Sequence, residues 1–159
     1  MVESKRFWDL KASVTFLRIL IGWHFLYEGI IKMYSPDWTS FGYLASSQGF
    51  MKPIFGALTS QAIMGWVDML NIAALTFVGL ALLLGIFEKL GVWVAIGLLA
   101  MYYLAHPPFP WLAQIKVEGS YWFVNKNLIE LAACLVLLQV PTGSYFGLKR
   151  LFNKKSETN

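Results

Sequence analysis

Ionisable and hydrogen-bonding side chains stand in a few short stretches of an otherwise apolar chain. In the first stretch His24, Glu28 and Lys32 follow one another at intervals of four residues, so a helix would carry them on one face. Carboxylates and imidazoles can exchange protons there, and a lysine can attract an anion. Three later stretches have a helical spacing of three or four residues and give the remaining candidates: Asp68 with Asn71, Tyr102 with His106 and the adjacent Tyr103, and Asn127 with Glu130 and the nearby Lys126.

These candidates divide by the chemistry that each side chain allows. Glu28, Asp68 and Glu130 are the candidates for catalytic proton transfer. The others can hold a carbonyl group by a hydrogen bond or attract an anion, and they are the candidates for substrate binding: Lys32, Asn71, Tyr102, Tyr103, His106, Lys126 and Asn127.

A purely structural explanation stays open for each of these residues. The pairs Glu28 with Lys32 and Lys126 with Glu130 have the spacing of helix ion pairs, and amides often join helices within membranes. A central Asp or Lys that faced lipid would cost on the order of 2.5–3.5 kcal/mol, so these faces are expected to point into the protein. Because acids outnumber lysines in the set, we favour a functional polar layer.

The elements that must position this layer are membrane helices. The chain has 159 residues, of which 57% are hydrophobic and 14% charged, and its mean hydropathy is +0.56. Such a chain is too apolar for a soluble core of this size, and each crossing needs about 20 mostly apolar residues. We predict an all-α membrane protein with a single domain over residues 1–159 and a bundle of four transmembrane helices, over about 13–33, 65–87, 90–105 and 121–140.

The distribution of basic residues predicts the orientation. Lys and Arg are enriched on the cytoplasmic side of membrane proteins. With both termini in the cytoplasm, that side holds Lys5, Arg6, Lys11, Lys89, Lys149, Arg150, Lys154 and Lys155, against Lys32, Lys52, Lys116 and Lys126 outside. The polar layer then lies in the outer half of the membrane and forms a cavity open to the outside. Arg18, about 15 Å from Glu28 along the helix, is expected to snorkel toward cytoplasmic headgroups.

The connection between the first two helices is apolar as well. It carries Phe41, Tyr43, Leu44, Phe50, Met51, Ile54, Phe55 and Leu58. We expect this external loop to lie on the membrane surface, with an amphipathic piece beginning near Pro53 that rests among the headgroups or caps the bundle.

Several chemistries lack the residues that they need. Cys134 is the single cysteine, so the chain cannot form its own disulfide or a CxxC pair. His24 and His106 fall at different membrane depths, and neither haem nor a metal is expected. The net charge of +4 comes from basic residues that flank apolar segments, which favours membrane lipid over nucleic acid as partner. Homo-oligomer formation is left open.

A resemblance to a known family rests on the stretch Gly22-Trp23-His24-Phe25-Leu26-Tyr27-Glu28-Gly29-Ile30-Ile31-Lys32, followed by Pro36, Trp38 and Gly42-Tyr43-Leu44. These residues resemble the first-helix signature of the DoxX/DoxD membrane family, although Glu28 stands where smaller residues are more usual. Further similar features are Asn71, Gly79, Gly85, Asn125-Lys126-Asn127-Leu128-Ile129-Glu130, and Gly143 through Gly147-Leu148. The resemblance implies a four-helix protein of the prokaryotic plasma (inner) membrane. For DoxD relatives it also implies the membrane part of a thiosulfate:quinone oxidoreductase that works with a second redox subunit.

Three functional hypotheses follow. The first is a membrane subunit of a quinone-linked oxidoreductase, with quinone as substrate and a small sulfur anion oxidised at the outer polar layer. The second is a non-enzymatic adaptor or assembly subunit in which the layer only fixes helix packing, so whether the chain is an enzyme stays open. A solute or proton path ranks last, because only Arg18 and Gln139 extend the polar residues inward.

Overall fold

A computed structural model describes residues 9–112 and 120–150 of the chain. Lys5, Arg6, Lys116, Lys154 and Lys155, which entered the charge count, lie outside the described residues. The elements in chain order are α1 (Leu10–Tyr34), α2 (Phe41–Ala45), α3 (Lys52–Ala57), α4 (Met64–Leu84), α5 (Glu88–Ala105), β1 (Ser120–Tyr121), β2 (Val124–Asn125), α6 (Lys126–Gln139) and α7 (Gly143–Phe146).

Three of the described helices are long and apolar enough to cross a membrane. They are α1 with 25 residues, α4 with 21 and α5 with 18. Their bounds lie within a few residues of the first three predicted segments. The chain is therefore mainly helical and has the character of a multi-pass membrane protein.

The fourth membrane helix, predicted over 121–140, is shorter in the structure. Helix α6 has 14 residues, or about 21 Å of length at 1.5 Å per residue. Residues 120–125 instead form an antiparallel hairpin of β1 and β2, and Trp122 in its turn has a φ of 58°. The helix begins only where the Asn125 side chain accepts a hydrogen bond from the Leu128 N–H at 3.0 Å.

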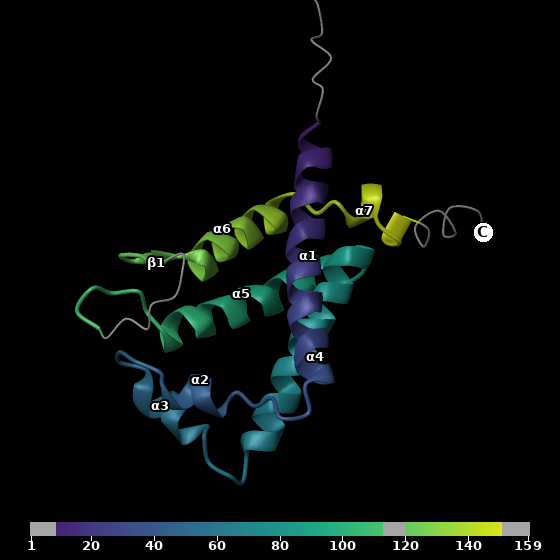
Figure 1. The fold of residues 1–159 in the computed structure, drawn as a ribbon. Coiled ribbons are helices and arrows are strands. Elements are labelled where there is room, and N and C mark those ends of the chain that lie inside the picture. Colours follow the sequence, from purple (N-terminus) through teal and green to yellow (C-terminus); the bar gives the residue numbers. More distant parts are fainter. Residues whose placement is uncertain (1–8, 113–119, 151–159) are drawn as a thin grey trace, which may run out of the picture.

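The long helices pack as two pairs. Helix α1 lies against α4, and α5 lies against α6 across them (Figure 1). Gly79 on α4 permits the close approach of the first pair, because a Cβ there would lie 2.6 Å from Leu26 Cα on α1. The largest group of buried apolar side chains fills the space between the four helices: Val14, Ile21, Phe25, Leu75, Val78, Leu82, Val92, Ala95, Leu99, Cys134 and Leu137.

The connection between α1 and α4 folds back over one end of the helices. Helix α3 carries Pro53 in its first turn, as expected of the piece predicted to begin there. Leu44 of α2 and Phe55 of α3 are buried together with Ala105 at the end of α5. Residues 41–57, called the α2–α3 segment below, therefore cover the end of α5 (Figure 1).

The opposite end of the bundle holds a buried ion pair, and here the prediction for Arg18 is wrong. Arg18 is 0% exposed instead of snorkelling, its Nη2 donates to the Phe146 carbonyl at 2.9 Å, and its Nη1 lies 3.7 Å from Glu88 Oε2. The Glu88 carboxylate also accepts from the N–H groups of Thr142 at 3.1 Å and Gly143 at 2.7 Å. Arg18 is held inside because α7 folds back onto the α4–α5 turn and covers it.

Candidate functional site

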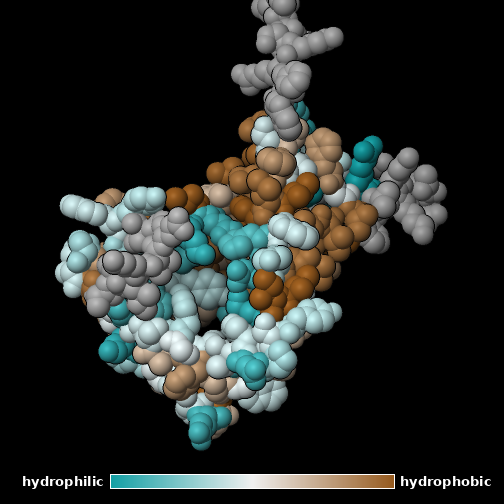
Figure 2. Space-filling model, viewed as in Figure 1, coloured by the Kyte–Doolittle hydropathy of each residue, from teal (hydrophilic) through white to brown (hydrophobic). Residues whose placement is uncertain are grey.

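A cavity of about 680 Å³ lies between the long helices and the α2–α3 segment. Figure 2 shows a hollow on the face in view, with hydrophilic residues around it. Its wall is largely apolar, with residues such as Phe25, Leu75 and Leu99. The polar side chains that line it are His24, Glu28, Lys32, Thr39, Ser40, Tyr43, Asn71, Tyr102, Lys126 and Asn127.

The cavity brings together part of the predicted site. Glu28, Lys32, Asn71, Tyr102, Lys126 and Asn127 all line it. Asp68, Tyr103, His106 and Glu130 do not. Asp68, His106 and Glu130 each contact a residue of the wall, whereas Tyr103 contacts Phe123 outside it. The polar layer inferred from helix direction therefore exists as a spatial cluster, with an inner set of residues and a set behind it.

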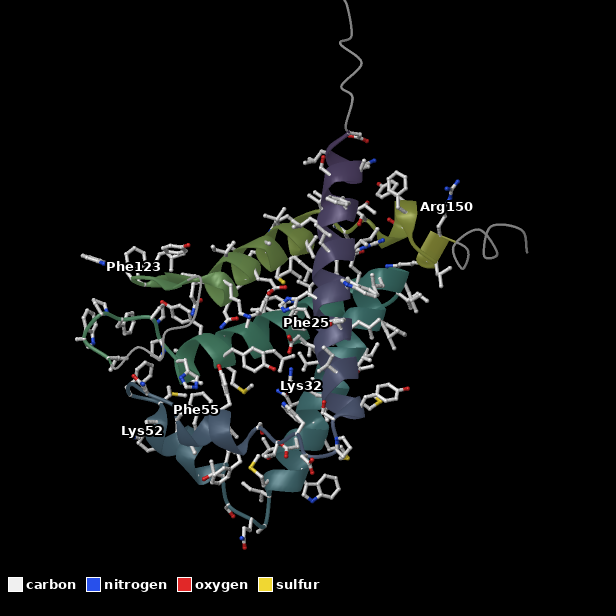
Figure 3. All side chains as sticks on the ribbon, in the orientation of Figure 1. Phe25, Lys32, Lys52, Phe55, Phe123 and Arg150 are labelled. Atoms are coloured by element: carbon white, nitrogen blue, oxygen red, sulfur yellow. The ribbon has the colours of Figure 1, made fainter. Side chains whose placement is uncertain are left out.

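Glu28 and Lys32 form one pair on α1. Lys32 Nζ and Glu28 Oε2 make a short ion pair across one helical turn, as the spacing predicted. Lys32 Nζ also lies 5.5 Å from the centre of the Trp38 ring, within the range of a cation–π contact. Lys32 lies on α1 near the α2–α3 segment, whereas Lys52 lies on α3 (Figure 3).

Glu130 pairs with His24, which lies on the predicted polar face but was not among the predicted catalytic or binding residues. Nδ1 of His24 lies 2.7 Å from Oε1 of Glu130, joining α1 to α6. The ion pair between Lys126 and Glu130, which the spacing allowed, does not form among the described residues. The signal for His24 was present in its spacing of four from Glu28, but the partner across the helices depends on tertiary packing.

A chain of hydrogen bonds links α4, α5 and α2. Asn71 Nδ2 donates to the Tyr102 hydroxyl at 2.8 Å, and the Tyr43 hydroxyl donates to the Tyr102 carbonyl at 3.1 Å. The His106 ring lies 4.4 Å from the Tyr43 ring, and its Nε2 lies 3.0 Å from the Tyr43 carbonyl oxygen. Burial, with a smaller contribution from nearby Tyr102, raises the pKa of Tyr43, so this phenol stays protonated and acts as a donor.

The remaining predicted residues hold the surroundings of the cavity in place. Tyr103 donates to the Phe123 carbonyl at 2.7 Å and so ties α5 to the β1–β2 hairpin. Asp68 Oδ1 accepts from the backbone N–H of Ser40 at 2.8 Å and from its hydroxyl at 2.5 Å. Because Ser40 lines the cavity and precedes α2, Asp68 fixes one end of the α2–α3 segment to α4.

Replacing Asp68 by alanine is expected to loosen the α2–α3 segment. A hydrogen bond to a charged group contributes about 1.5–3 kcal/mol, so cleavage within residues 35–63 in limited proteolysis should accelerate by about tenfold or more. The matched control is Asp37→Ala, which changes an exposed aspartate of the same connection. Equal cleavage rates in the two variants would show that Asp68 does not hold the segment.

The described residues offer little for a metal. Within 9–112 and 120–150, no group of three or more His, Cys, Asp or Glu is arranged to hold an ion. Cys134 is buried and free. The residues that line the cavity can donate a hydrogen bond to a carbonyl group and can exchange protons. They also place negative and positive charge beside an apolar wall.

The fold and the cavity define a class: a small multi-pass helical membrane protein with a cavity near one end whose largely apolar wall also carries polar side chains. The DoxX family model matches residues 13–107, and the chain belongs to this family. The quoted features from Gly22 to Gly85 lie within the match, whereas those from Asn125 onward lie after it. Comparisons with curated proteins and with solved structures give no match.

Proposed function

We propose that the chain crosses the plasma membrane of a prokaryote four times, with both termini in the cytoplasm. On this proposal α6 is the fourth crossing and is extended by the residues that flank it, because 14 residues alone fall short of about 30 Å of hydrocarbon. The cavity then opens on the outer side, and the α2–α3 segment lies at the outer surface. Protease access to tags at each terminus in sealed, inside-out vesicles tests this orientation.

We further propose that the cavity is the quinone site of an oxidoreductase. The observation that carries this proposal is the combination of an apolar wall with Asn71, Tyr102 and Glu28 in one space of about 680 Å³. A quinone needs an apolar slot, a hydrogen bond at its carbonyl groups and a source of protons when it is reduced. Membership of the DoxX family is compatible with this role.

A small sulfur anion of the thiosulfate type is the proposed electron source. Lys32 lies in an ion pair with Glu28, whereas Lys126 lines the cavity and has no ion-pair partner among the described residues. Lys126 is therefore the cation best placed to attract an anion into the cavity. The sequence has one cysteine and no nucleotide-binding glycine motif, so electrons pass directly between the substrates or through a second redox subunit.

The test is reduction of a soluble quinone analogue by thiosulfate, followed by absorbance, with the purified protein or the complex that copurifies with it. We expect Glu28→Gln and Lys126→Met to lower kcat/KM by about tenfold or more, since each removes a charge from the cavity. Lys52→Met is the matched control, because Lys52 is exposed on α3 and lies outside the cavity lining. Unchanged turnover in both cavity variants would remove the proposed site.

The adaptor hypothesis is supported by a different observation. His24 on α1 pairs with Glu130 on α6, as residues that only join helices would, and Glu28 pairs with Lys32 within α1. On this alternative, Glu130→Ala destabilises the protein in detergent, a partner protein copurifies, and neither the protein nor the complex binds or reduces a quinone. Quinone reduction by the wild-type protein or complex would exclude it.

A further inference from the structure

The His24–Glu130 pair is arranged asymmetrically with respect to the cavity. His24 lines the cavity and 41% of its side chain is exposed, whereas Glu130 is outside the lining and 14% exposed. Nδ1 of His24 faces the carboxylate at 2.7 Å. The other ring nitrogen, Nε2, has no hydrogen-bond partner among the described residues, and His24 itself lines the cavity.

This geometry is that of a histidine prepared for proton exchange. A carboxylate bound to Nδ1–H fixes the tautomer and the ring orientation, and it stabilises the imidazolium when Nε2 is protonated. Histidine has an ordinary pKa near 6.5, so it gives and accepts protons at neutral pH more readily than lysine, whose ordinary pKa is about 10.4.

Several other polar groups in the wall are already engaged. Glu28 is paired with Lys32, the Tyr102 hydroxyl accepts from Asn71, and the Tyr43 hydroxyl donates to a carbonyl. The charged groups that act on the His24 ring are Glu130 and Lys126 from α6 and Glu28 from α1, while α5 adds the phenol of Tyr102 to the same cavity. His24 therefore has the free titratable atom best suited to proton transfer.

We propose that His24 exchanges protons with the quinone in this cavity and that Glu130 is a positioning residue that acts through the imidazole. The inference rests on the proposed quinone-linked function. Two thiosulfate-type anions lose one electron each as an S–S bond forms between them, and the quinone gains both electrons. The His24 Nε2–H bond breaks as an O–H bond forms on one quinone oxygen. His24 regains a proton from water and supplies the second O–H bond in the same way.

The experiment compares His24→Gln, Glu130→Gln and the exposed-carboxylate control Asp37→Asn in the thiosulfate-to-quinone assay. Glutamine can hydrogen-bond a carbonyl but cannot transfer a proton at neutral pH. We expect His24→Gln to lower kcat by about 10²–10⁴-fold, with the Kd of the quinone analogue within about threefold of wild type. Its residual rate should lose the pH dependence that protonation of the imidazole gives the wild-type rate.

Glu130→Gln is expected to keep the ring contact but to shift the pH profile. Wild-type kcat should fall as pH rises and the imidazolium loses its proton. Without the neighbouring negative charge the imidazolium is less stable, so this fall should move to lower pH in Glu130→Gln. Asp37→Asn should follow the wild-type profile.

The outcomes separate this inference from the proposed function. Wild-type kcat in His24→Gln, or an unchanged pH profile, overturns the role of His24 while quinone reduction by the wild type still stands. Loss of quinone binding in His24→Gln to the same extent as loss of turnover also overturns it, because the residue then acts only in binding or folding. A wild-type protein or complex that neither binds nor reduces the quinone overturns the proposed function itself.

Discussion

Replacing Glu88 by leucine is expected to lower the free energy of unfolding by about 3–5 kcal/mol, which is typical when one partner of a buried ion pair is removed. The change leaves the Arg18 guanidinium buried beside no carboxylate, and it takes the acceptor from the N–H groups of Thr142 and Gly143. Denaturation of the protein in mixed detergent micelles, followed by circular dichroism, measures the loss. Helix α7 should also detach, because these bonds hold its first turn.

The double variant Arg18→Met/Glu88→Leu provides the control for this prediction. It removes both charges and keeps apolar bulk, so it should be more stable than Glu88→Leu alone by about 1–4 kcal/mol. If the two variants unfold at the same detergent fraction, the buried Arg18 charge is not the source of the loss.

Replacing Gly79 by alanine is expected to force α1 and α4 apart. The added Cβ would lie 2.6 Å from Leu26 Cα, a backbone atom that cannot move without its helix. Overpacking of this kind costs about 1–3 kcal/mol, and here it exceeds the gain of about 1 kcal/mol that alanine brings to a helix. The thermal unfolding midpoint in detergent should therefore fall, and cavity residues on α1 and α4 should shift relative to each other.

Gly65→Ala is the matched control on the same helix. A Cβ at Gly65 meets nothing within 4 Å, so the substitution changes helix propensity without a steric clash. It should leave the midpoint unchanged or raise it slightly. A fall of equal size in both variants would assign the effect to the loss of glycine rather than to close helix packing.

The long helices could be predicted from the sequence because their signal is local. Apolar stretches of sufficient length and the paucity of charge within them identify α1, α4 and α5 to within a few residues. The start of α6 was misplaced, because Tyr121 to Asn125 are apolar enough to extend a helix pattern. The turn at Trp122 and the Asn125 cap decide the boundary instead.

The sequence predicted which face of a helix carries the polar residues. It did not predict which of these residues pair across helices. Spacing placed His24, Glu28 and Lys32 on one side of a helix, and the ion pair of Glu28 with Lys32 follows from it. Contacts across helices depend on rotation and register, which no local pattern specifies. For that reason the spacing suggested Lys126 as a possible partner of Glu130, whereas Glu130 pairs with His24 in the structure.

Arg18 shows the same division most clearly. By itself the sequence determined that α1 is a membrane helix with a basic residue about 15 Å along the helix from Glu28, because helical rise and hydropathy are properties of neighbouring residues. Only the tertiary structure decided that Arg18 is buried, because its partners Glu88 at the start of α5 and Phe146 of α7 lie 70 and 128 residues away along the chain. The cavity is decided in the same way: its residues were identified as candidates one helix at a time, and packing brought them to one space.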